Sequence, residues 1–208
     1  MARYVVLGRT AGLKAAYFNA APKYNGLYDV YEVDKINRTV ERRGLAAFEV
    51  LAAPQPGCLW LATYDLDPAS RSSYDYKRIR EELALRHACG RADNSTYLCA
   101  SDPSDTLRQL VEGKGRYRVE CVRPANGAAE ALARAAMVDA LTFSAALLRE
   151  QASRLRGGGV ARARRMLEAA RAARESGAVD LAASLAGRDL ARELSEAYAA
   201  LGASLGLL

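Results

Sequence analysis

The chain has 208 residues, a net charge of +6 and a hydrophobic fraction of 50%. This hydrophobic content is enough for a packed core and excludes an intrinsically disordered chain. The positive charge is too dilute for a polycation, but it permits an anionic partner such as a nucleic acid. No run of about 18 apolar residues occurs, so we expect no membrane span. The apolar run near the N-terminus is too short for a signal peptide, which predicts a cytoplasmic protein.

The composition changes near Pro124. All five lysines, all six prolines, all four cysteines and ten of the eleven tyrosines lie in residues 1–124. Residues 125–208 are rich in Ala, Leu, Arg and Glu and contain no Pro or Lys. Tyr favours strands, and Ala, Leu, Arg and Glu favour helices. The sequence therefore predicts an α/β domain over 1–124 and a helical domain over 125–208.

The first part of the α/β domain is expected to contain three strands and a helix. Residues 2–7 predict a strand, and residues 13–21 predict a short helix that ends before a proline. Residues 27–34 and 45–52 predict two strands, and the polar, basic segment between them predicts a hairpin with a long or bent tip. The apolar run 58–66 is typical of a central strand.

Strands and helices then alternate. Residues 74–87 predict a helix closed by Gly90, and residues 94–100 predict a strand. A further helix is expected to begin with Ser104 as its N-cap, and residues 116–122 alternate polar and apolar as a last strand does. Right-handed crossovers on one sheet would give a ferredoxin-like α/β sandwich, to which the hairpin is added.

The C-terminal part predicts three Ala-rich helices, at about 128–156, 160–175 and 179–205. Glycine-containing breaks separate them, and their narrow apolar stripes favour a helical hairpin or a three-helix bundle. The apolar surface that remains predicts a homo-oligomer or a protein partner. The alternative is that the helices fold back on the α/β domain of the same chain.

The cysteines are Cys58, Cys89, Cys99 and Cys121. They show no C-x-x-C spacing and the chain has a single histidine, so we expect buried thiols and no metal site. Cys99 and Cys121 lie in two predicted strands, which leaves a disulfide between them open. A cytosolic disulfide would be unusual outside a hyperthermophile. The chain has only eight Asn and Gln residues, which favours a thermophilic, archaeal source.

Two carboxylates follow the predicted central strand. Asp65 and Asp67 stand where strand ends commonly present catalytic or metal-binding groups, and together they could hold Mg²⁺ with the help of water. The sequence Asp-x-Asp-Pro is also an ordinary turn signal, so the pair has a purely structural interpretation as well.

One stretch resembles a known family. The sequence WLATYDLD at 60–67, a basic helix with Arg78 and Arg80, and NSTYLC at 94–99 follow one another as in the small CRISPR adaptation endonuclease. The resemblance covers residues 57–124 and implies a ferredoxin-like fold with a metal-binding role for Asp65. The first 56 residues and the helical C-terminal part depart from that small one-domain pattern.

Basic and aromatic residues give the preferred hypothesis, which is binding of single-stranded nucleic acid. Arginine and lysine reach phosphates, and tyrosine stacks on bases. The candidate residues are Arg38, Arg42, Arg43, Tyr76, Lys77, Arg78, Lys114, Arg116, Tyr117 and Arg118. The structural alternative is that the tyrosines pack in the core and the arginines solvate a face.

The sequence is consistent with three classes of function. The first is a non-enzymatic nucleic-acid-binding protein that needs no cofactor and uses 125–208 to contact a second copy or another protein. The second is a structural subunit of a larger complex or virus-like particle. The third is a metal-dependent nuclease that uses Asp65 and Mg²⁺.

Overall fold

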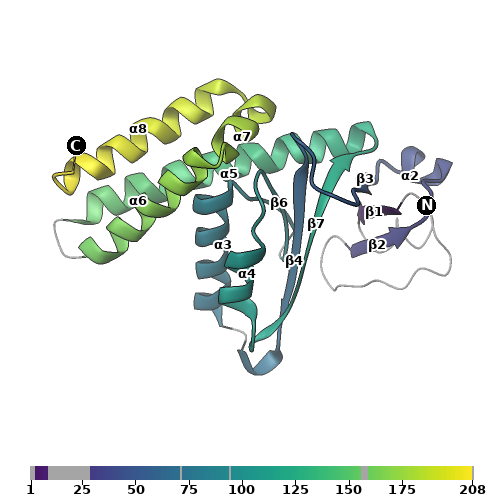
Figure 1. Cartoon of the computed structure of the whole chain (residues 1–208), viewed down its shortest axis with the longest axis horizontal. Coiled ribbons are helices and arrows are strands. Elements are labelled where there is room, and N and C mark those ends of the chain that lie inside the picture. The colour runs from purple at the N-terminus through teal and green to yellow at the C-terminus, as the bar shows by residue number, and fades with distance from the viewer. Residues whose placement is uncertain (1–2, 9–28, 71, 94, 156–158, 208) are drawn as a thin grey trace.

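Figure 1 shows a computed structural model of the chain, in which residues 3–8, 29–70, 72–93, 95–155 and 159–207 are described. These residues form a seven-stranded antiparallel sheet and seven α-helices, so the mixed α/β character expected from composition is confirmed. The helix predicted at 13–21 lies outside the described residues.

All seven strands belong to one sheet in the order β2-β1-β3-β7-β4-β6-β5. Their bounds are β1 Arg3–Gly8, β2 Asp29–Val33, β3 Ala46–Val50, β4 Leu59–Leu66, β5 Gly90–Asp93, β6 Thr96–Cys99 and β7 Gly115–Pro124. Every paired neighbour runs antiparallel.

The hairpin predicted over 27–52 is wrong. Strand β1 lies between β2 and β3, so that Val5 is opposite Glu32 on one side and opposite Phe48 on the other. The polar segment forms helix α2 (Arg38–Arg42), which begins where the Asn37 side chain accepts hydrogen bonds from two backbone N–H groups. Two strand patterns that follow one another along the chain are typical of a hairpin. Local sequence cannot show that a third strand lies between the two in the sheet.

The second half of the sheet has a strand–helix–strand–strand–helix–strand order. Helix α3 (Ser73–His87) follows β4 and a short 3₁₀ turn at Pro68–Ser70, and helix α4 (Ser104–Val111) follows β6. The sequence prediction did not include the four-residue strand β5, which pairs only with β6. Strand β6 runs antiparallel to both β4 and β5, so β5 has the same direction as β4.

Two helix boundaries differ from the predictions. Helix α3 ends at Ala88, which takes the left-handed conformation, whereas Gly90 already begins β5. A Cβ on Gly90 would lie 1.5 Å from the carbonyl oxygen of Ala136, so glycine is required there for close packing. Ser104 is the first residue of α4, and the Asp102 carboxylate accepts hydrogen bonds from its backbone and hydroxyl.

The described residues of the C-terminal part form four helices rather than three. They are α5 (Gly127–Arg154), α6 (Val160–Glu175), α7 (Ala178–Ala186) and α8 (Arg188–Ser204). The third predicted helix is interrupted at Gly187. Its φ of 113° is readily adopted by glycine and lies outside the range of a right-handed helix. In Figure 1, α5 runs across one face of the sheet, and α3 and α4 lie on the other.

Alternate residues of β4 separate two cores. Leu59 and Leu61 pack in the cluster that contains α5, whereas Tyr64 and Leu66 pack with α3 and α4. This is the side-chain alternation expected of a strand covered on both faces.

The helices and the sheet share their largest core. Val5 and Phe48 of the sheet, Met137 of α5 and Leu201 of α8 belong to one cluster of buried residues. Asn126 caps α5 and also donates a hydrogen bond to the Leu45 carbonyl, which ties the start of the helix to the sheet. The predicted domain boundary at residue 124 therefore coincides with the junction of β7 and α5, while the hydrophobic core continues across it.

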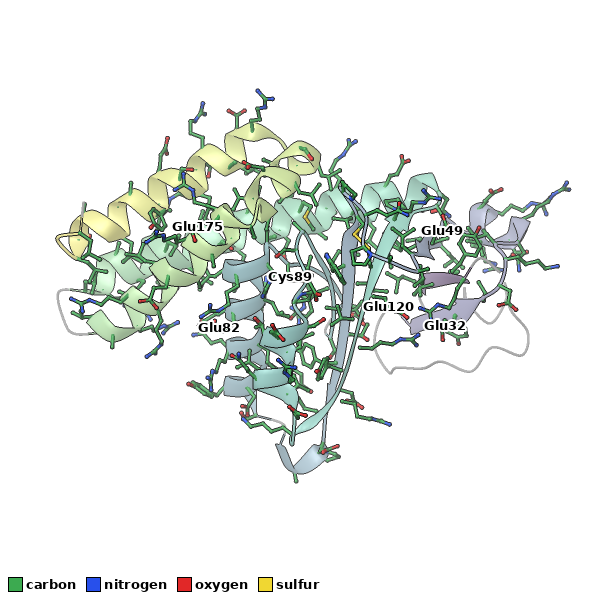
Figure 2. All side chains as sticks on the ribbon, viewed as in Figure 1. Glu32, Glu49, Glu82, Cys89, Glu120 and Glu175 are labelled. Atoms are coloured by element: carbon green, nitrogen blue, oxygen red, sulfur yellow. A yellow bond between two sulfur atoms is a disulfide. The ribbon has the colours of Figure 1, made fainter. Side chains whose placement is uncertain are left out.

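The expectation of free, buried thiols is wrong, and so is the suggested pair of Cys99 with Cys121. Disulfides join Cys58 to Cys121 and Cys89 to Cys99, and both appear as yellow bonds in Figure 2. The strand order explains this pairing, because β7 and β6 lie on opposite sides of β4 and the two cysteines on them are not neighbours. Disulfides of this kind are expected in an oxidising compartment or in a hyperthermophile.

Helix α5 also has the length and apolar composition of a membrane-crossing helix. Its most apolar window has a mean hydropathy of 1.5, and half of that window is buried inside the molecule. A core helix that is covered by protein on several sides has the same length and composition, so these two features do not by themselves indicate a membrane span.

Candidate nucleic-acid interface

The ten residues predicted to bind nucleic acid lie in three separate places. Three are on or directly after α2, four are on or directly before β7, and three are on α3. The structure therefore does not bring all ten together on one surface, although Lys114 contacts Asp75 at the start of α3.

Helix α2 carries an exposed basic cluster. Arg38, Arg42 and Arg43 are exposed, and they make no ion pair within the described parts of the chain. Buried Val40 holds the helix against the sheet beside Tyr31 and Val6. The cluster has no neighbouring exposed aromatic ring in the described residues, so it offers charge without stacking.

On β7, Arg116 and Arg118 share one face and Tyr117 lies on the other, as predicted from the strand period. Tyr117 packs partly buried against the α3 and α4 core. The side chain of Arg116 is 86% exposed and lies 3.8 Å from Asp65. Lys114 pairs with Asp75 at 3.0 Å.

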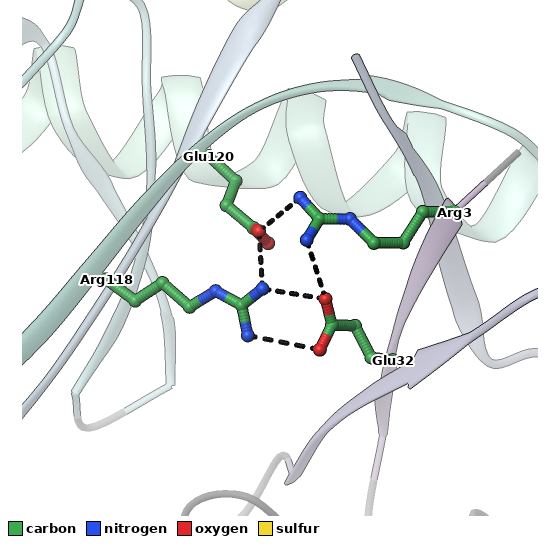
Figure 3. A network of polar contacts seen from close by, with 4 residues as sticks. All are labelled: Arg3, Glu32, Arg118 and Glu120. Atoms are coloured by element: carbon green, nitrogen blue, oxygen red, sulfur yellow. Dashed lines mark hydrogen bonds and ion pairs between the residues drawn. The ribbon is translucent and has the colours of Figure 1, made fainter. Parts of the chain in front are cut away.

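Arg118 is not available to a phosphate, because carboxylates surround it. Its guanidinium donates to Glu32 at 2.7 and 3.2 Å and to Glu120 at 2.6 Å, and Arg3 bridges the same two carboxylates (Figure 3). This alternating ring of two arginines and two glutamates joins β1, β2 and β7. We conclude that Arg118 is a structural residue of the sheet.

Asp65 and Asp67 stand at the end of β4, as predicted. Asp65 is partly exposed beside Arg116, and the backbone of Asp67 donates to the Lys114 carbonyl at 2.8 Å. Within the described ranges, no group of three His, Cys, Asp or Glu side chains is placed to hold a metal ion. The Mg²⁺ hypothesis for Asp65 stays a prediction.

The third place is a groove between α3, α4 and α6 with a volume of about 530 Å³, which we call the basic groove. Five cationic and two acidic side chains line it. They are Lys77, Arg78, Arg86, Arg162 and Arg165, with Glu81 and Glu82. Figure 2 labels Glu82 on α3.

The carboxylates of the basic groove are engaged by only some of its cations. Arg162 binds Glu81 at 2.9 Å, Lys77 lies 3.9 Å from the same carboxylate, and Arg86 binds Glu82 at 2.7 Å. Arg78 and Arg165 are exposed and form no ion pair in the part of the chain that the structure describes. The groove therefore keeps a positive excess that is open to solvent.

An aromatic ring completes the basic groove. Tyr74 lines it and is 69% exposed, which makes it the most exposed large hydrophobic residue described. The first turn of α3 presents this ring, and Ser72 caps that turn by accepting a hydrogen bond from the Asp75 backbone. The Ser72 hydroxyl also donates to the Asp75 carboxylate, and this bond, followed by the one from Lys114, lowers the pKa of Asp75.

The sequence hypothesis included Lys77 and Arg78 of this groove but not Arg86, Arg162 or Arg165. Only the packing of α6 against α3 shows that Arg162 and Arg165 face the same groove as Arg78.

Comparison of the chain with protein-family models, with curated proteins and with solved structures finds no match. The resemblance of residues 57–124 to the small CRISPR adaptation endonuclease therefore stays a prediction.

Proposed function

We propose that this protein binds nucleic acid, with a preference for single strands, through the basic groove. The observation that carries the proposal is the excess of five cations over two carboxylates in one groove that an exposed tyrosine also lines. Cations along a groove follow a phosphate backbone, and an exposed ring stacks on an unpaired base. Paired bases in a duplex offer no such face to Tyr74, which is the reason for the strand preference.

The proposed fold of the β4–β7 unit is ferredoxin-like. Its support is the order β7-β4-β6-β5, with the two helices α3 and α4 in the same core cluster. Such a sheet offers a rigid base for the helices that carry the groove. The fold alone says nothing of the activity.

We also propose that α5–α8 contact a second copy or another protein. Four of the five exposed large hydrophobic residues in the described chain lie on or just after these helices: Val138, Val160, Leu185 and Leu207. Multi-angle light scattering of the purified protein tests this. A mass above that of one 22.4 kDa chain supports a homo-oligomer, and a monomeric mass at all concentrations contradicts it.

Fluorescence anisotropy with labelled single- and double-stranded DNA and RNA tests the main proposal. If Lys77, Arg78 and Arg165 each neutralise one phosphate, the logarithmic salt slope is about −2 for single strands. Affinity then falls about 100-fold between about 50 mM and about 500 mM salt. Affinity that does not change with salt contradicts the proposal. Cleavage of the strand that needs Mg²⁺ would instead favour the nuclease.

A further inference from the structure

A second cavity, which we call the tyrosine pocket, lies on a different side of α3 from the basic groove. It has a volume of about 380 Å³ and is enclosed by α3, β4, β5, β6 and α5. Four aromatic rings line it: Tyr64, Tyr76, Tyr97 and Phe143. Lys77 and Glu81 belong to the walls of both cavities, so the two are neighbours across one helix.

The tyrosine rings form one packed wall. The ring centroids of Tyr64 and Tyr97 lie 6.1 Å apart with nearly parallel planes, and Tyr76 lies 5.9 Å from Tyr64. Tyr64 and Tyr97 are each 1% exposed, whereas Tyr76 is partly exposed at the opening. A flat ligand that enters beside Tyr76 meets aromatic surface and not water.

Two polar atoms in the wall are buried and lack a hydrogen bond of good geometry in the described structure: the Nε of Arg80 and the hydroxyl of Tyr64, which also interacts with the Tyr97 side chain. Buried polar atoms in proteins are almost always hydrogen-bonded. Two such atoms in one pocket indicate that a ligand supplies their partners. Burial raises the pKa of Tyr64 far above its ordinary value, so its hydroxyl keeps the proton and can donate it.

The orientation of Arg80 is fixed before any ligand arrives. Its Nη2 donates to Asp139 at 3.2 Å, and its guanidinium lies 3.9 Å above the centroid of the Phe143 ring. Asp139 is itself fixed, because it accepts a hydrogen bond from the backbone of Arg91 at 3.0 Å. The Nε–H that remains is a pre-oriented, charged donor, which suits an anionic oxygen.

The carboxylates at the pocket are engaged by arginines outside it. Glu81 accepts hydrogen bonds from Arg162 at 2.9 and 3.0 Å, and Glu150 pairs with Arg154 at 2.7 Å. Neither Arg162 nor Arg154 lines the tyrosine pocket. Lys77 also lies 3.9 Å from Glu81, but this contact is longer than the 2.9 Å pair of Glu81 with Arg162, so Glu81 neutralises Lys77 only in part.

We propose that the tyrosine pocket binds a nucleoside monophosphate, either as the free nucleotide or as the end nucleotide of a strand. The base stacks at the aromatic wall beside Tyr76, and the phosphate accepts from Arg80 and Lys77. The Tyr64 hydroxyl donates to the base or the ribose. The cavity falls within the range of about 300 to 1,000 Å³ that small-ligand sites occupy. Only the strand-end form rests on the proposed nucleic-acid binding.

Isothermal titration calorimetry with adenosine 5′-monophosphate tests the proposal, with adenosine and inorganic phosphate as partial ligands. We expect a Kd below about 1 mM for the nucleotide and binding at least about tenfold weaker for each part. Tyr64→Phe and Arg80→Lys should each weaken nucleotide binding about fivefold or more. Tyr64→Phe should leave the thermal midpoint unchanged or raise it, because it removes a buried hydroxyl that lacks a hydrogen bond of good geometry in the free protein.

The matched control is Tyr74→Phe with Arg78→Gln, which changes the basic groove and leaves the tyrosine pocket intact. This control should bind the mononucleotide as the wild type does but bind oligonucleotides more weakly, so the two proposals can fail separately. A 5′-phosphorylated oligonucleotide displaced by the mononucleotide identifies the strand end as the occupant, and no displacement identifies the free nucleotide. No saturable binding of the mononucleotide, or equal binding by Tyr64→Phe, would overturn the proposal.

Discussion

Arg162 on α6 donates two hydrogen bonds, at 3.0 and 2.9 Å, to the carboxylate of Glu81 on α3. The two residues are 81 positions apart in sequence, and their contact fixes the C-terminal helices against the α/β unit at the basic groove. The side chain of Glu81 is only 15% exposed, so this pair is screened less than a surface ion pair.

The first prediction concerns this contact. Arg162→Gln should lower the free energy of unfolding by about 1 to 2 kcal/mol. The substitution removes a partly buried ion pair in which the Nη2 of Arg162 contacts both carboxylate oxygens of Glu81. Chemical denaturation measures the change. Arg171→Gln is the matched control, since Arg171 pairs with Glu175 within one helix on an exposed surface. Equal destabilisation by both substitutions would show that the contact between α3 and α6 contributes no more to the free energy of unfolding than an exposed pair within one helix.

The single histidine predicts a pH dependence of stability. Burial, and then the neighbouring Arg86, lower the pKa of His87 to about 4 from its ordinary value of 6.5. Its ring nitrogens lie 3.0 Å from the Ser101 hydroxyl and 2.8 Å from the Thr106 hydroxyl, which joins the end of α3 to α4.

Because the folded pKa is below the unfolded one, the unfolded state binds the proton more tightly. The contribution of His87 is full above about pH 6.5 and is lost as the pH falls towards about 4. This amounts to about 3 kcal/mol. Urea unfolding of the wild type and of His87→Gln at both ends of this range measures it. The variant should be less sensitive to pH, and an equal pH slope in both proteins would refute the assignment.

Gly90 should not tolerate a side chain. Its added Cβ would overlap the carbonyl of Ala136 on α5, and both partners are backbone, so neither can move aside cheaply. Gly90→Ala should lower the free energy of unfolding by about 3 kcal/mol or more. Gly127→Ala, at the start of α5, meets nothing within 4 Å and should be neutral or stabilising. Similar stabilities for the two variants would contradict the packing of α5 on β5.

The disulfides predict a strong effect of reduction. The Cys58–Cys121 bond spans 63 residues and the Cys89–Cys99 bond spans 10. From loop-closure entropy we expect about 4 kcal/mol of stabilisation from the longer bond and about 3 kcal/mol from the shorter. Calorimetry should show a fall in Tm of roughly 10 °C when Cys58 and Cys121 are both replaced by Ser. Thiol titration of the unfolded, unreduced protein would contradict the pairing if it found four free thiols.

The sequence predicted the elements better than their arrangement. The patterns of residues 45–52, 58–66 and 116–122 predicted β3, β4 and β7 within a few residues, because strand alternation and turn residues are local signals. The insertion of β1 between β2 and β3 depends on pairing across distant segments, which no local pattern specifies. The disulfide pairing depends on the same strand order, since Cys121 lies opposite Trp60 on β4.

The candidate site was predictable only in part. Lys77 and Arg78 were identified because they follow tyrosines at a helix start. Arg118 also follows a tyrosine, in a predicted strand, yet the structure surrounds it with Glu32 and Glu120. The contribution of Arg165 follows from the docking of α6 on α3, which is a tertiary contact.

The most direct test of the central claim compares two double variants for binding of labelled single-stranded DNA and RNA over a range of salt. Arg78→Gln with Arg165→Gln removes two open cations of the basic groove, and Arg38→Gln with Arg42→Gln removes the same charge from α2. We predict that the groove variant reduces the logarithmic salt slope from about −2 to about −0.7. The α2 variant should keep the slope of the wild type. Loss of binding in the α2 variant, with the groove variant unchanged, would contradict the account.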